Sequence, residues 1–219
     1  MDIEVIHRYI PLYVEAAKLT LRLAVIGIIG AIIVGFVCSI IQYYKIPIIH
    51  KIVGGYIELS RNTPLLIQLF FLYFGLPKLG IIMSSETCAI VGLIFLGGSY
   101  MSEAFRSGLE AIPKIQEESG LSLGLKRWQV IQTILLPQAI MISMPAFLAN
   151  IIFLIKETSV FSVVALADLM YVAKDLIGLY YDTDEALFLL VVSYLILLLP
   201  ISVIFTIVER RLKRVAIGN

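Results

Sequence analysis

Long apolar runs separated by short polar connections dominate the chain. A helix needs about 20 apolar residues to cross a membrane. Five runs approach that length, at residues 19–42, 54–75, 86–107, 134–155 and 186–208. The pattern therefore predicts an all-α, polytopic membrane protein with about five transmembrane helices. No internal repeat or linker is visible, so we expect residues 1–219 to form a single transmembrane domain.

The segment 156–185 does not fit this pattern. It is too polar for a full span and too apolar for a free loop, as its stretch "SVFSVVALADLMYVAKDLIG" illustrates. We expect either a helix that lies on the outer surface of the membrane or one that dips into it, and the pattern leaves both open.

Composition supports a lipid environment. The chain is 60% hydrophobic and 15% charged, whereas soluble domains average about 45–50% apolar and about 25% charged residues. A net charge of +1 gives no sign of a nucleic-acid partner. Cys38 and Cys88 both lie in apolar runs, and we interpret them as buried fillers. The acidic first residues do not resemble a cleaved signal peptide, so we expect the first apolar run to direct the chain to the membrane.

Basic residues set the expected orientation. They gather after the first, third and fifth spans, while the other connections hold several acids. Because cytoplasmic loops collect Lys and Arg, we expect the N-terminus outside and the C-terminus in the cytoplasm. We interpret Lys126–Arg127 and Arg210–Arg214 as anchors on anionic lipid. The basic residues behind this orientation are Lys45, Lys51, Arg106, Lys114, Lys126, Arg127, Arg210, Arg211, Lys213 and Arg214.

A polar stretch, "EESGLSLGLKRWQVIQTILLP" at 117–137, interrupts the apolar pattern on the expected cytoplasmic side. Pro113 is suited to open a short helix, and Gly124 is suited to end it because glycine accepts a left-handed turn. Such a helix can dock in a groove of a partner protein, or it can simply rest on lipid. Physical reasoning alone leaves both interpretations open.

The spacing of this stretch resembles the EAA motif of ABC-transporter permease subunits. In that motif, Glu-Ala-Ala is followed by three residues, Gly, nine residues and Ile-x-Leu-Pro. Ser119 and Gly120 replace the two alanines, and both replacements are small. The resemblance implies a short cytoplasmic coupling helix that contacts a separate ATPase. The coupling residues it implies are Glu118, Ser119, Gly120, Gly124, Ile134 and Pro137.

Three longer stretches are similar to the polar amino acid branch of these permeases: "RNTPLLIQLFFLYFGLP" at 61–77, "GGSYMSEAFRSGLEAIPKIQ" at 97–116 and "LPQAIMISMPAFLANIIFLIKETSV" at 136–160. This resemblance implies a fold like that of type I ABC importers, in a bacterial inner membrane. The partners it implies are an ATPase, an extracytoplasmic substrate-binding protein and a second permease chain, identical or paralogous. An amino acid would be the cargo, and membrane lipid would surround the chain.

Sequence features give no sign of catalysis. The P-loop pattern G-x-x-x-x-G-K-[ST] does not occur, so we expect the partner to bind ATP and this chain to carry no cofactor. His7 and His50 are the only histidines, and neither a zinc ligand set nor a nucleophile triad can be assembled around them. We therefore expect a non-enzymatic subunit without a metal site.

Several polar side chains are expected at membrane depth, where an unpaired charge costs upward of about 2.5 kcal/mol. Arg61 and Glu103 are candidates for a substrate path, and Gln68 and Tyr100 are weaker ones. The alternative is that Glu103 pairs with Arg61 or with Arg106 and only fixes the packing of helices.

Two charges and two hydroxyls stand together at Lys156, Glu157, Thr158 and Ser159, between apolar flanks. If both flanks lie in the membrane, a helix breaks there and presents main-chain groups that suit a zwitterionic ligand. The alternative is the ordinary end of a span. The Gly97–Gly98 pair is expected to allow close helix packing.

Three functions follow from these features. The first is a permease subunit of an ATP-driven importer for polar amino acids, which moves its cargo by alternating access. The second is an ion-gradient-driven transporter or channel subunit, and the third is a membrane scaffold. The sequence leaves the amino acid open, with a slight preference for a basic one.

Overall fold

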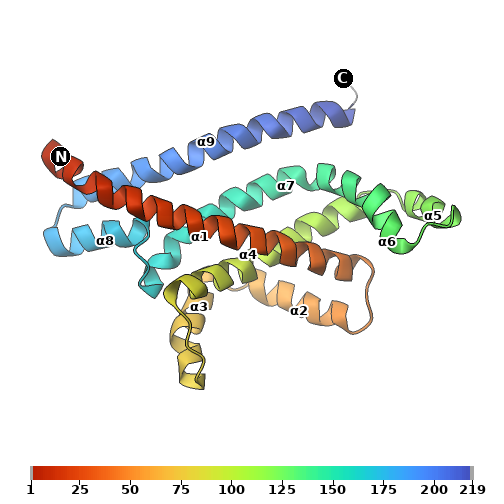
Figure 1. The fold of residues 1–219 in the computed structure, drawn as a ribbon, viewed down its shortest axis with the longest axis horizontal. Coiled ribbons are helices and arrows are strands. Elements are labelled where there is room, and N and C mark those ends of the chain that lie inside the picture. Colours follow the sequence, from red (N-terminus) through yellow and green to blue (C-terminus); the bar gives the residue numbers. More distant parts are fainter. Residues whose placement is uncertain (1, 218–219) are drawn as a thin grey trace.

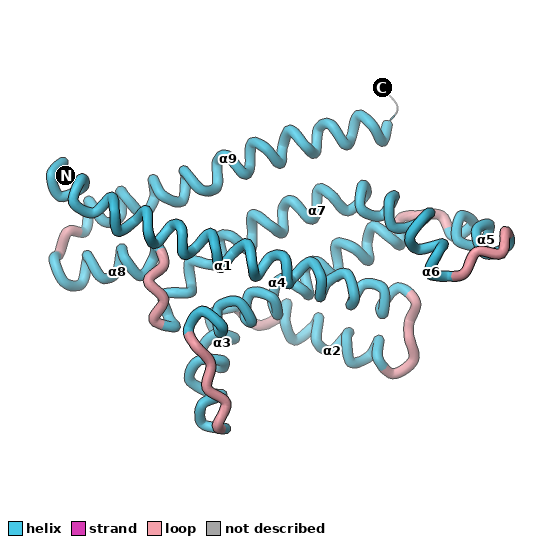
Figure 2. The backbone as a smooth tube through the Cα atoms, in the orientation of Figure 1, coloured by secondary structure: helices cyan, strands magenta, loops and turns pink. Residues whose placement is uncertain are grey.

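A computed structural model describes the backbone of residues 2–217 and the side chains of residues 2–211, so Lys213 and Arg214 lie outside the described side chains. The described chain is helical and contains no strand (Figure 2). Its α-helices are α1 (Ile3–Tyr43), α2 (Ile49–Arg61), α3 (Leu65–Phe70), α4 (Ser85–Glu110), α5 (Lys114–Ser122), α6 (Arg127–Val130), α7 (Leu136–Glu157), α8 (Leu169–Tyr180) and α9 (Thr183–Ile217). Two π-helices, η1 (Phe71–Gly75) and η3 (Ile131–Leu135), and two 3-10 helices, η2 (Leu76–Leu79) and η4 (Thr158–Val164), join them.

The predicted all-α membrane fold is confirmed. Four helical segments of the described chain are long and apolar enough to cross a bilayer: Ile3–Tyr43, Ser85–Glu110, Arg127–Val164 and Thr183–Arg211. The structure differs from the sequence pattern at the second run, 54–75, which is two helices and not one. Proline lacks the N–H that a helix interior needs and disfavours the helical conformation of the residue before it. The chain therefore breaks at Asn62–Pro64, and α3 turns away from the line of α2 (Figure 1).

Small residues bring α1 and α4 into close contact along their length. A Cβ atom at Gly27 would lie 2.6 Å from Cδ2 of Leu93, and one at Gly35 would lie 2.5 Å from Cβ of Met101. These contacts advance by the same number of residues on both helices, so α1 and α4 run in the same direction. Helices in membranes associate through small residues of this kind.

Helix α7 packs on α4 in the opposite direction. The hydroxyl of Ser143 donates to the carbonyl oxygen of Ala104 at 2.8 Å. Near the other end of the contact, a Cβ atom at Gly97 would lie 2.8 Å from Cδ1 of Leu154 and 2.7 Å from Cβ of Ala31. The close-packing role predicted for the Gly97–Gly98 pair is therefore confirmed.

Much of the segment between α7 and α9 forms the short helix α8, and its position relative to the membrane surface stays a prediction. Helix α8 packs against the first turns of α1 and α9 (Figure 1) and forms an apolar cluster with them. Its 12 residues are too short to span a bilayer. The hydroxyl of Tyr13 fixes α1 to α9 by donating to the carbonyl oxygen of Ala186 at 2.7 Å. The buried members of the cluster are Tyr9, Tyr13, Ala16, Leu169, Ala173, Leu176, Ala186 and Leu189.

Both π-helices have the same cause in the sequence. Each ends two residues before a proline: η1 before Pro77 and η3 before Pro137. A proline removes one helical hydrogen bond and its ring clashes with the carbonyl four residues earlier. A π-helical turn absorbs that mismatch within an otherwise continuous helix.

Candidate functional site

The short helix that the polar stretch predicts is α5. Pro113 precedes it directly, and Gly124 ends it with a φ of +82°. The N–H of Leu125 donates to the carbonyl oxygen of Gly120 at 3.2 Å, and that of Gly124 donates to Leu121 at 3.0 Å. These two bonds form a Schellman motif, which satisfies the last carbonyls of a helix. The predicted start and end of the helix are confirmed.

Gly120 lets α5 lie against the π-helix η3. A Cβ atom there would approach Cδ1 of Ile134 to 2.8 Å and Cγ2 of Val130 to 3.0 Å. Glu118 and Ser119 point away from this contact and are exposed. Pro137 stands at the beginning of α7, just beyond η3. The six predicted coupling residues therefore form one unit with a packed inner side and a free outer side.

Two further contacts hold α5, and the sequence analysis did not identify them. Nε2 of Gln138 donates to Oε1 of Gln116 at 2.6 Å and to the carbonyl oxygen of Ile134 at 2.7 Å. The hydroxyl of Tyr43, at the end of α1, donates to Oε2 of Glu117 at 3.1 Å. The signal that was available in the sequence is a glutamine directly after Pro137 within an apolar run.

Arg61, Glu103 and Arg106 form a connected ion-pair network between α2 and α4. Nη1 of Arg61 lies 3.5 Å from Oε2 of Glu103, and Nη2 of Arg106 lies 2.8 Å from the same oxygen. Arg106 also reaches Oε1 of Glu110 at 2.8 Å. Both ion pairs considered in the sequence analysis are present, so Glu103 pairs with Arg61 and Arg106 at the same time.

A polar cavity of about 240 Å³ opens beside this network. The guanidinium of Arg61 lies 5.4 Å from the ring centroid of Tyr100, whose ring packs at a tilt against that of Phe153 with the centroids 5.0 Å apart. One cation and one carboxylate, Arg61 and Glu157, face the cavity. Its lining comprises Arg61, Asn62, Thr63, Pro64, Leu65, Leu96, Tyr100, Phe153 and Glu157.

The four residues from Lys156 to Ser159 do not act as one group. Helix α7 ends at Glu157 and continues as the 3-10 helix η4, so the backbone changes conformation where the sequence predicted a break. Among the four, only Glu157 lines the cavity. Lys156 is exposed, Thr158 is buried with its hydroxyl donating to the carbonyl oxygen of Ile155 at 2.7 Å, and Ser159 is half-buried.

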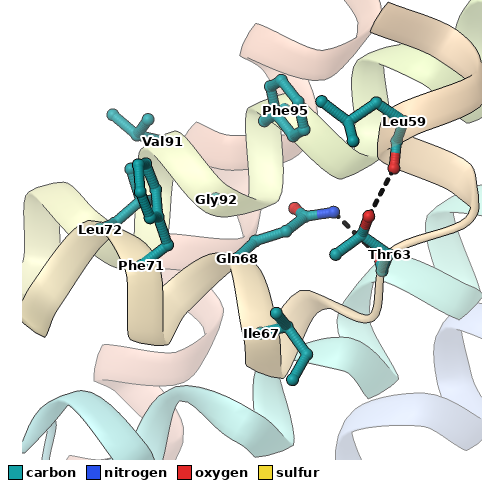
Figure 3. Close-up of a pocket in the computed structure, with 9 residues that line it drawn as sticks. All are labelled: Leu59, Thr63, Ile67, Gln68, Phe71, Leu72, Val91, Gly92 and Phe95. Atoms are coloured by element: carbon teal, nitrogen blue, oxygen red, sulfur yellow. Dashed lines mark hydrogen bonds between the residues drawn. The ribbon is translucent and has the colours of Figure 1, made fainter. Parts of the chain in front are cut away.

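Gln68 lies apart from that cavity. Its Nε2 donates to the carbonyl oxygens of Ser60 at 3.1 Å and Thr63 at 2.9 Å, and thereby closes the break between α2 and α3. Figure 3 shows the amide turned toward Thr63, whose hydroxyl donates to the carbonyl oxygen of Leu59 at 2.7 Å. Gln68 lines a separate, mostly apolar cavity of about 380 Å³.

Asn62 and Thr63 are cavity residues that the sequence analysis missed. They lie in the break between α2 and α3, where Nδ2 of Asn62 donates to the carbonyl oxygen of Glu58 at 2.8 Å. The signal was the triplet Asn-Thr-Pro at 62–64 inside an apolar run, because such a triplet favours a turn over a continuous helix.

The two cysteines are buried and free, as predicted for fillers: Cys38 lies on α1 and Cys88 on α4. Within the described part of the chain, no three His, Cys, Asp or Glu side chains come together in a way that would hold a metal ion.

Comparison with known proteins identifies a family. Residues 27–214 match the family described as "Binding-protein-dependent transport system inner membrane component". The glutamine transport system permease protein GlnP of Escherichia coli (strain K12) is 33% identical over 206 residues, covering 93% of this chain and 94% of that protein. The arginine transport system permease protein ArtQ of Bacillus subtilis (strain 168) is 34% identical over 205 residues, with the same coverage, 93% and 94%.

Solved structures agree with this result. The crystal structure of an amino acid ABC transporter with histidines superposes with a TM-score of 0.87 at 28% identity, over 96% of this chain and 99% of the other. An inward-facing structure of the MetNI methionine ABC transporter gives a TM-score of 0.79 at 19% identity, over 97% and 99% of the two chains. At that identity the second likeness supports the fold alone.

Proposed function

Since this chain belongs to the family of binding-protein-dependent transport system inner membrane components, and is therefore a transport component rather than an enzyme, we propose that it is the membrane-spanning permease subunit of an ATP-driven importer for polar amino acids. The glutamine and arginine permeases among its relatives support the cargo class. The observation that carries the proposal is a cavity with one guanidinium and one carboxylate beside a broken helix.

This cavity suits the two charges that every free amino acid carries. An arginine can bind a carboxylate through two parallel hydrogen bonds, and Arg61 is the only cation in the lining. Glu157 is the matching partner for the α-ammonium group. The break at Asn62–Pro64 adds main-chain groups, as in other transporters with discontinuous helices. Glu103 forms an ion pair with Arg61, and the ring of Tyr100 lies against its guanidinium.

Coupling to ATP hydrolysis is assigned to α5. The proposed partner ATPase binds ATP and docks on the exposed side that carries Glu118 and Ser119. Movement of α5 reaches α7 through Gln116 and Gln138, and reaches α1 through Glu117 and Tyr43. To shift a two-state equilibrium from 1:99 to 99:1, the ATPase must bind one state about 5.5 kcal/mol more tightly than the other.

The proposed assembly contains a second permease chain, identical or paralogous, and an extracytoplasmic substrate-binding protein. We place it in a bacterial inner membrane with α5 on the cytoplasmic side and the first turns of α1, together with α8, outside. The clustering of basic residues near α5 supports this orientation.

The coupling assignment is tested with Glu118→Lys. The full chain is co-purified with its ATPase, and ATP hydrolysis is measured in proteoliposomes with the binding protein and glutamine or arginine. Reversing an exposed charge on α5 should weaken co-purification and substrate-stimulated hydrolysis while the chain still inserts. Glu15→Lys is the control, because Glu15 is exposed on α1 far from α5. Equal behaviour of the two variants would refute the coupling assignment.

The cavity is tested separately with Glu157→Gln and Arg61→Lys. Each should raise the KM for uptake by about ten-fold or more: Glu157→Gln removes the charge that meets the ammonium group, and Arg61→Lys keeps the charge but loses the two parallel hydrogen bonds of a guanidinium. ATPase docking should be unchanged, since neither residue touches α5. Unaltered KM and selectivity in both variants would remove the cavity from the substrate path. Uptake that continues without the ATPase, driven by an ion gradient, would favour the alternative transporter class.

A further inference from the structure

A second polar cavity, of about 580 Å³, lies at the other functional end of the molecule, where α1 and α4 end beside α5 and α6 (Figure 1). It is distinct from the proposed amino acid site, because the two linings share no residue. Its lining comprises Tyr43, Tyr44, Lys45, Glu110, Ile112, Lys114, Glu117 and Arg127.

Three cations face this cavity: Lys45, Lys114 and Arg127. The two carboxylates in the lining are already engaged. Oε1 of Glu110 is held by Arg106 at 2.8 Å, and Oε2 of Glu117 accepts from the hydroxyl of Tyr43 at 3.1 Å. The lining therefore carries an excess of positive charge, which favours an anion, because Arg106 from outside the lining offsets Glu110 while Glu117 stays charged.

Tyr44 adds a hydrogen-bond donor. Its hydroxyl is buried and interacts with the carboxylate of Glu117. Burial raises the pKa of Tyr44 to about 12, so the hydroxyl stays protonated at neutral pH. The guanidinium of Arg127 lies 5.9 Å from the centroid of the same ring. Tyr44 therefore keeps a hydroxyl donor and the guanidinium of Arg127 together on one side of the cavity.

The backbone of Lys45 is an independent indication. It lies directly after Tyr44, the C-cap of α1, with a φ of +48°, and its N–H donates to the carbonyl oxygen of Gln42 at 3.2 Å. Glycine is strongly favoured at this position of a helix end. A lysine here accepts local backbone strain and places an ammonium group at the cavity, which is a pattern found at functional sites.

The surroundings indicate that the ligand comes from the membrane. The apolar, exposed side of α1 extends to Val37, which is 51% exposed, and Tyr43, Tyr44 and Lys45 follow about two turns later. Trp128, beside Arg127, is 53% exposed. Aromatic residues followed by basic ones mark the depth of lipid headgroups.

We propose that this cavity binds the phosphate of an anionic phospholipid headgroup, with Lys45, Lys114 and Arg127 as its cationic ligands. A bound headgroup would bridge the end of α1 and the first turn of α5, so the lipid would hold the coupling helix in position. The assignment of the headgroup to the cytoplasmic leaflet rests on the orientation given under the proposed function. The binding of the lipid does not depend on that orientation.

The test titrates the purified full-length chain in detergent with dihexanoyl phosphatidylglycerol. Trp128 is the only tryptophan in the chain, so its fluorescence reports on the adjacent cavity. Lys45→Gly removes the ammonium group and also relieves the left-handed backbone. It should weaken binding about five-fold, as expected for one basic residue at a lipid surface, while the melting temperature stays equal or rises. Lys51→Gln, a charge lost outside the lining, should bind as the unaltered chain does.

Three further measurements bear on the proposal. Unchanged affinity in Lys45→Gly, or equal binding of dihexanoyl phosphatidylcholine, overturns it. Glycerol 3-phosphate that binds as tightly as the lipid overturns the membrane source. Binding is finally repeated with the ATPase docked: retention supports a lipid site, whereas loss assigns the cavity to the ATPase and overturns the proposal. Because the titration needs neither transport nor substrate, its result is independent of the amino acid assignment.

Discussion

Single glycines decide how closely the long helices approach. A Cβ atom at Gly35 would lie 2.8 Å from the backbone nitrogen of Ser102 as well as 2.5 Å from Cβ of Met101. Neither atom can move without shifting α4 itself. Gly55, in contrast, has nothing within 4 Å of an added Cβ.

This difference gives a first prediction. Gly35→Ala should destabilise the chain by about 1–3 kcal/mol, the usual cost of overpacking. Gly55→Ala should be neutral or stabilise by about 0.5–1 kcal/mol, because glycine is unfavourable inside a helix. The melting temperature in detergent measures both, and a Gly35→Ala variant as stable as Gly55→Ala would contradict the proposed α1–α4 contact.

Asp168 is a buried acid with an incomplete set of partners. It caps α8, and its Oδ1 accepts from the N–H of Tyr171 at 2.9 Å. Its Oδ2 has no hydrogen-bond partner among the described residues. Burial raises the pKa of Asp168 from its ordinary 3.8 to about 6, although backbone N–H groups and Lys174 act in the opposite direction.

The second prediction concerns pH. Below about pH 4 Asp168 is protonated in both folded and unfolded chains; between about pH 4 and 6 only the unfolded chain releases the proton. Stability should therefore fall as pH rises through this window and stay lower above it. Asp168→Asn keeps a good helix cap and cannot ionise. Relative to this variant, the unaltered chain should lose at least about 2–4 °C in melting temperature, the equivalent of ~1 kcal/mol at this size. If the melting temperatures of the two proteins changed with pH in the same way, Asp168 could not be the cause of the pH dependence.

At the scale of elements, the molecule depends on interrupted helices. Prolines at 64, 77 and 137 break or distort segments that would otherwise run straight. The first of these interruptions exposes main-chain groups at the cavity beside Arg61, and the third forms the π-turn on which α5 rests. Polar side chains then secure each interruption, Gln68 at the first and Gln138 at the third.

The third prediction separates the strain of a turn from its function. Gly124 and Gly80 have almost the same φ, +82° and +83°, and neither has an atom within 4 Å of an added Cβ. Alanine at either position should cost roughly 1 kcal/mol from the left-handed backbone alone. Only Gly124→Ala should also lower substrate-stimulated ATP hydrolysis, because it loosens the end of α5. An equal loss of hydrolysis in Gly80→Ala would show that strain, and not the coupling helix, is responsible.

At the scale of the whole molecule, the longest helix is longer than a bilayer is thick. Helix α1 has 41 residues and is about 60 Å long, twice the roughly 30 Å of a hydrocarbon core. The excess at its first turns is covered by α8 and the start of α9. The polar cavity near α5 lies at the opposite end.

The fourth prediction tests orientation. Ser122→Cys on α5 and Tyr180→Cys on α8 place exposed thiols at the two ends. A membrane-impermeant maleimide should label position 122 from the cytoplasmic side only and position 180 from the outside only. The unaltered chain is the control, since Cys38 and Cys88 are buried. The reverse labelling pattern would show that the orientation in the membrane is the opposite of the proposed one. Labelling of positions 122 and 180 from the same side would exclude the proposed arrangement of helices.

The sequence by itself determined the fold class, the short helix at 114–122 and the close-packing glycines. Each depends on local properties: the length of an apolar run, a proline that opens a helix, a glycine that ends one. The break at Asn62–Pro64 was also local, and its triplet was overlooked because the surrounding run is long and apolar.

Only the tertiary structure decided which polar residues meet. Arg61, Tyr100 and Glu157 come from three different helices, and their convergence depends on how α4 packs on α2 and α7. Lys156 and Thr158 flank Glu157 in sequence yet face elsewhere, because neighbouring residues on a helix point in different directions. Hydrophobic periodicity fixes where a helix forms, but the angle and depth at which helices contact each other are set by side chains far apart in the chain.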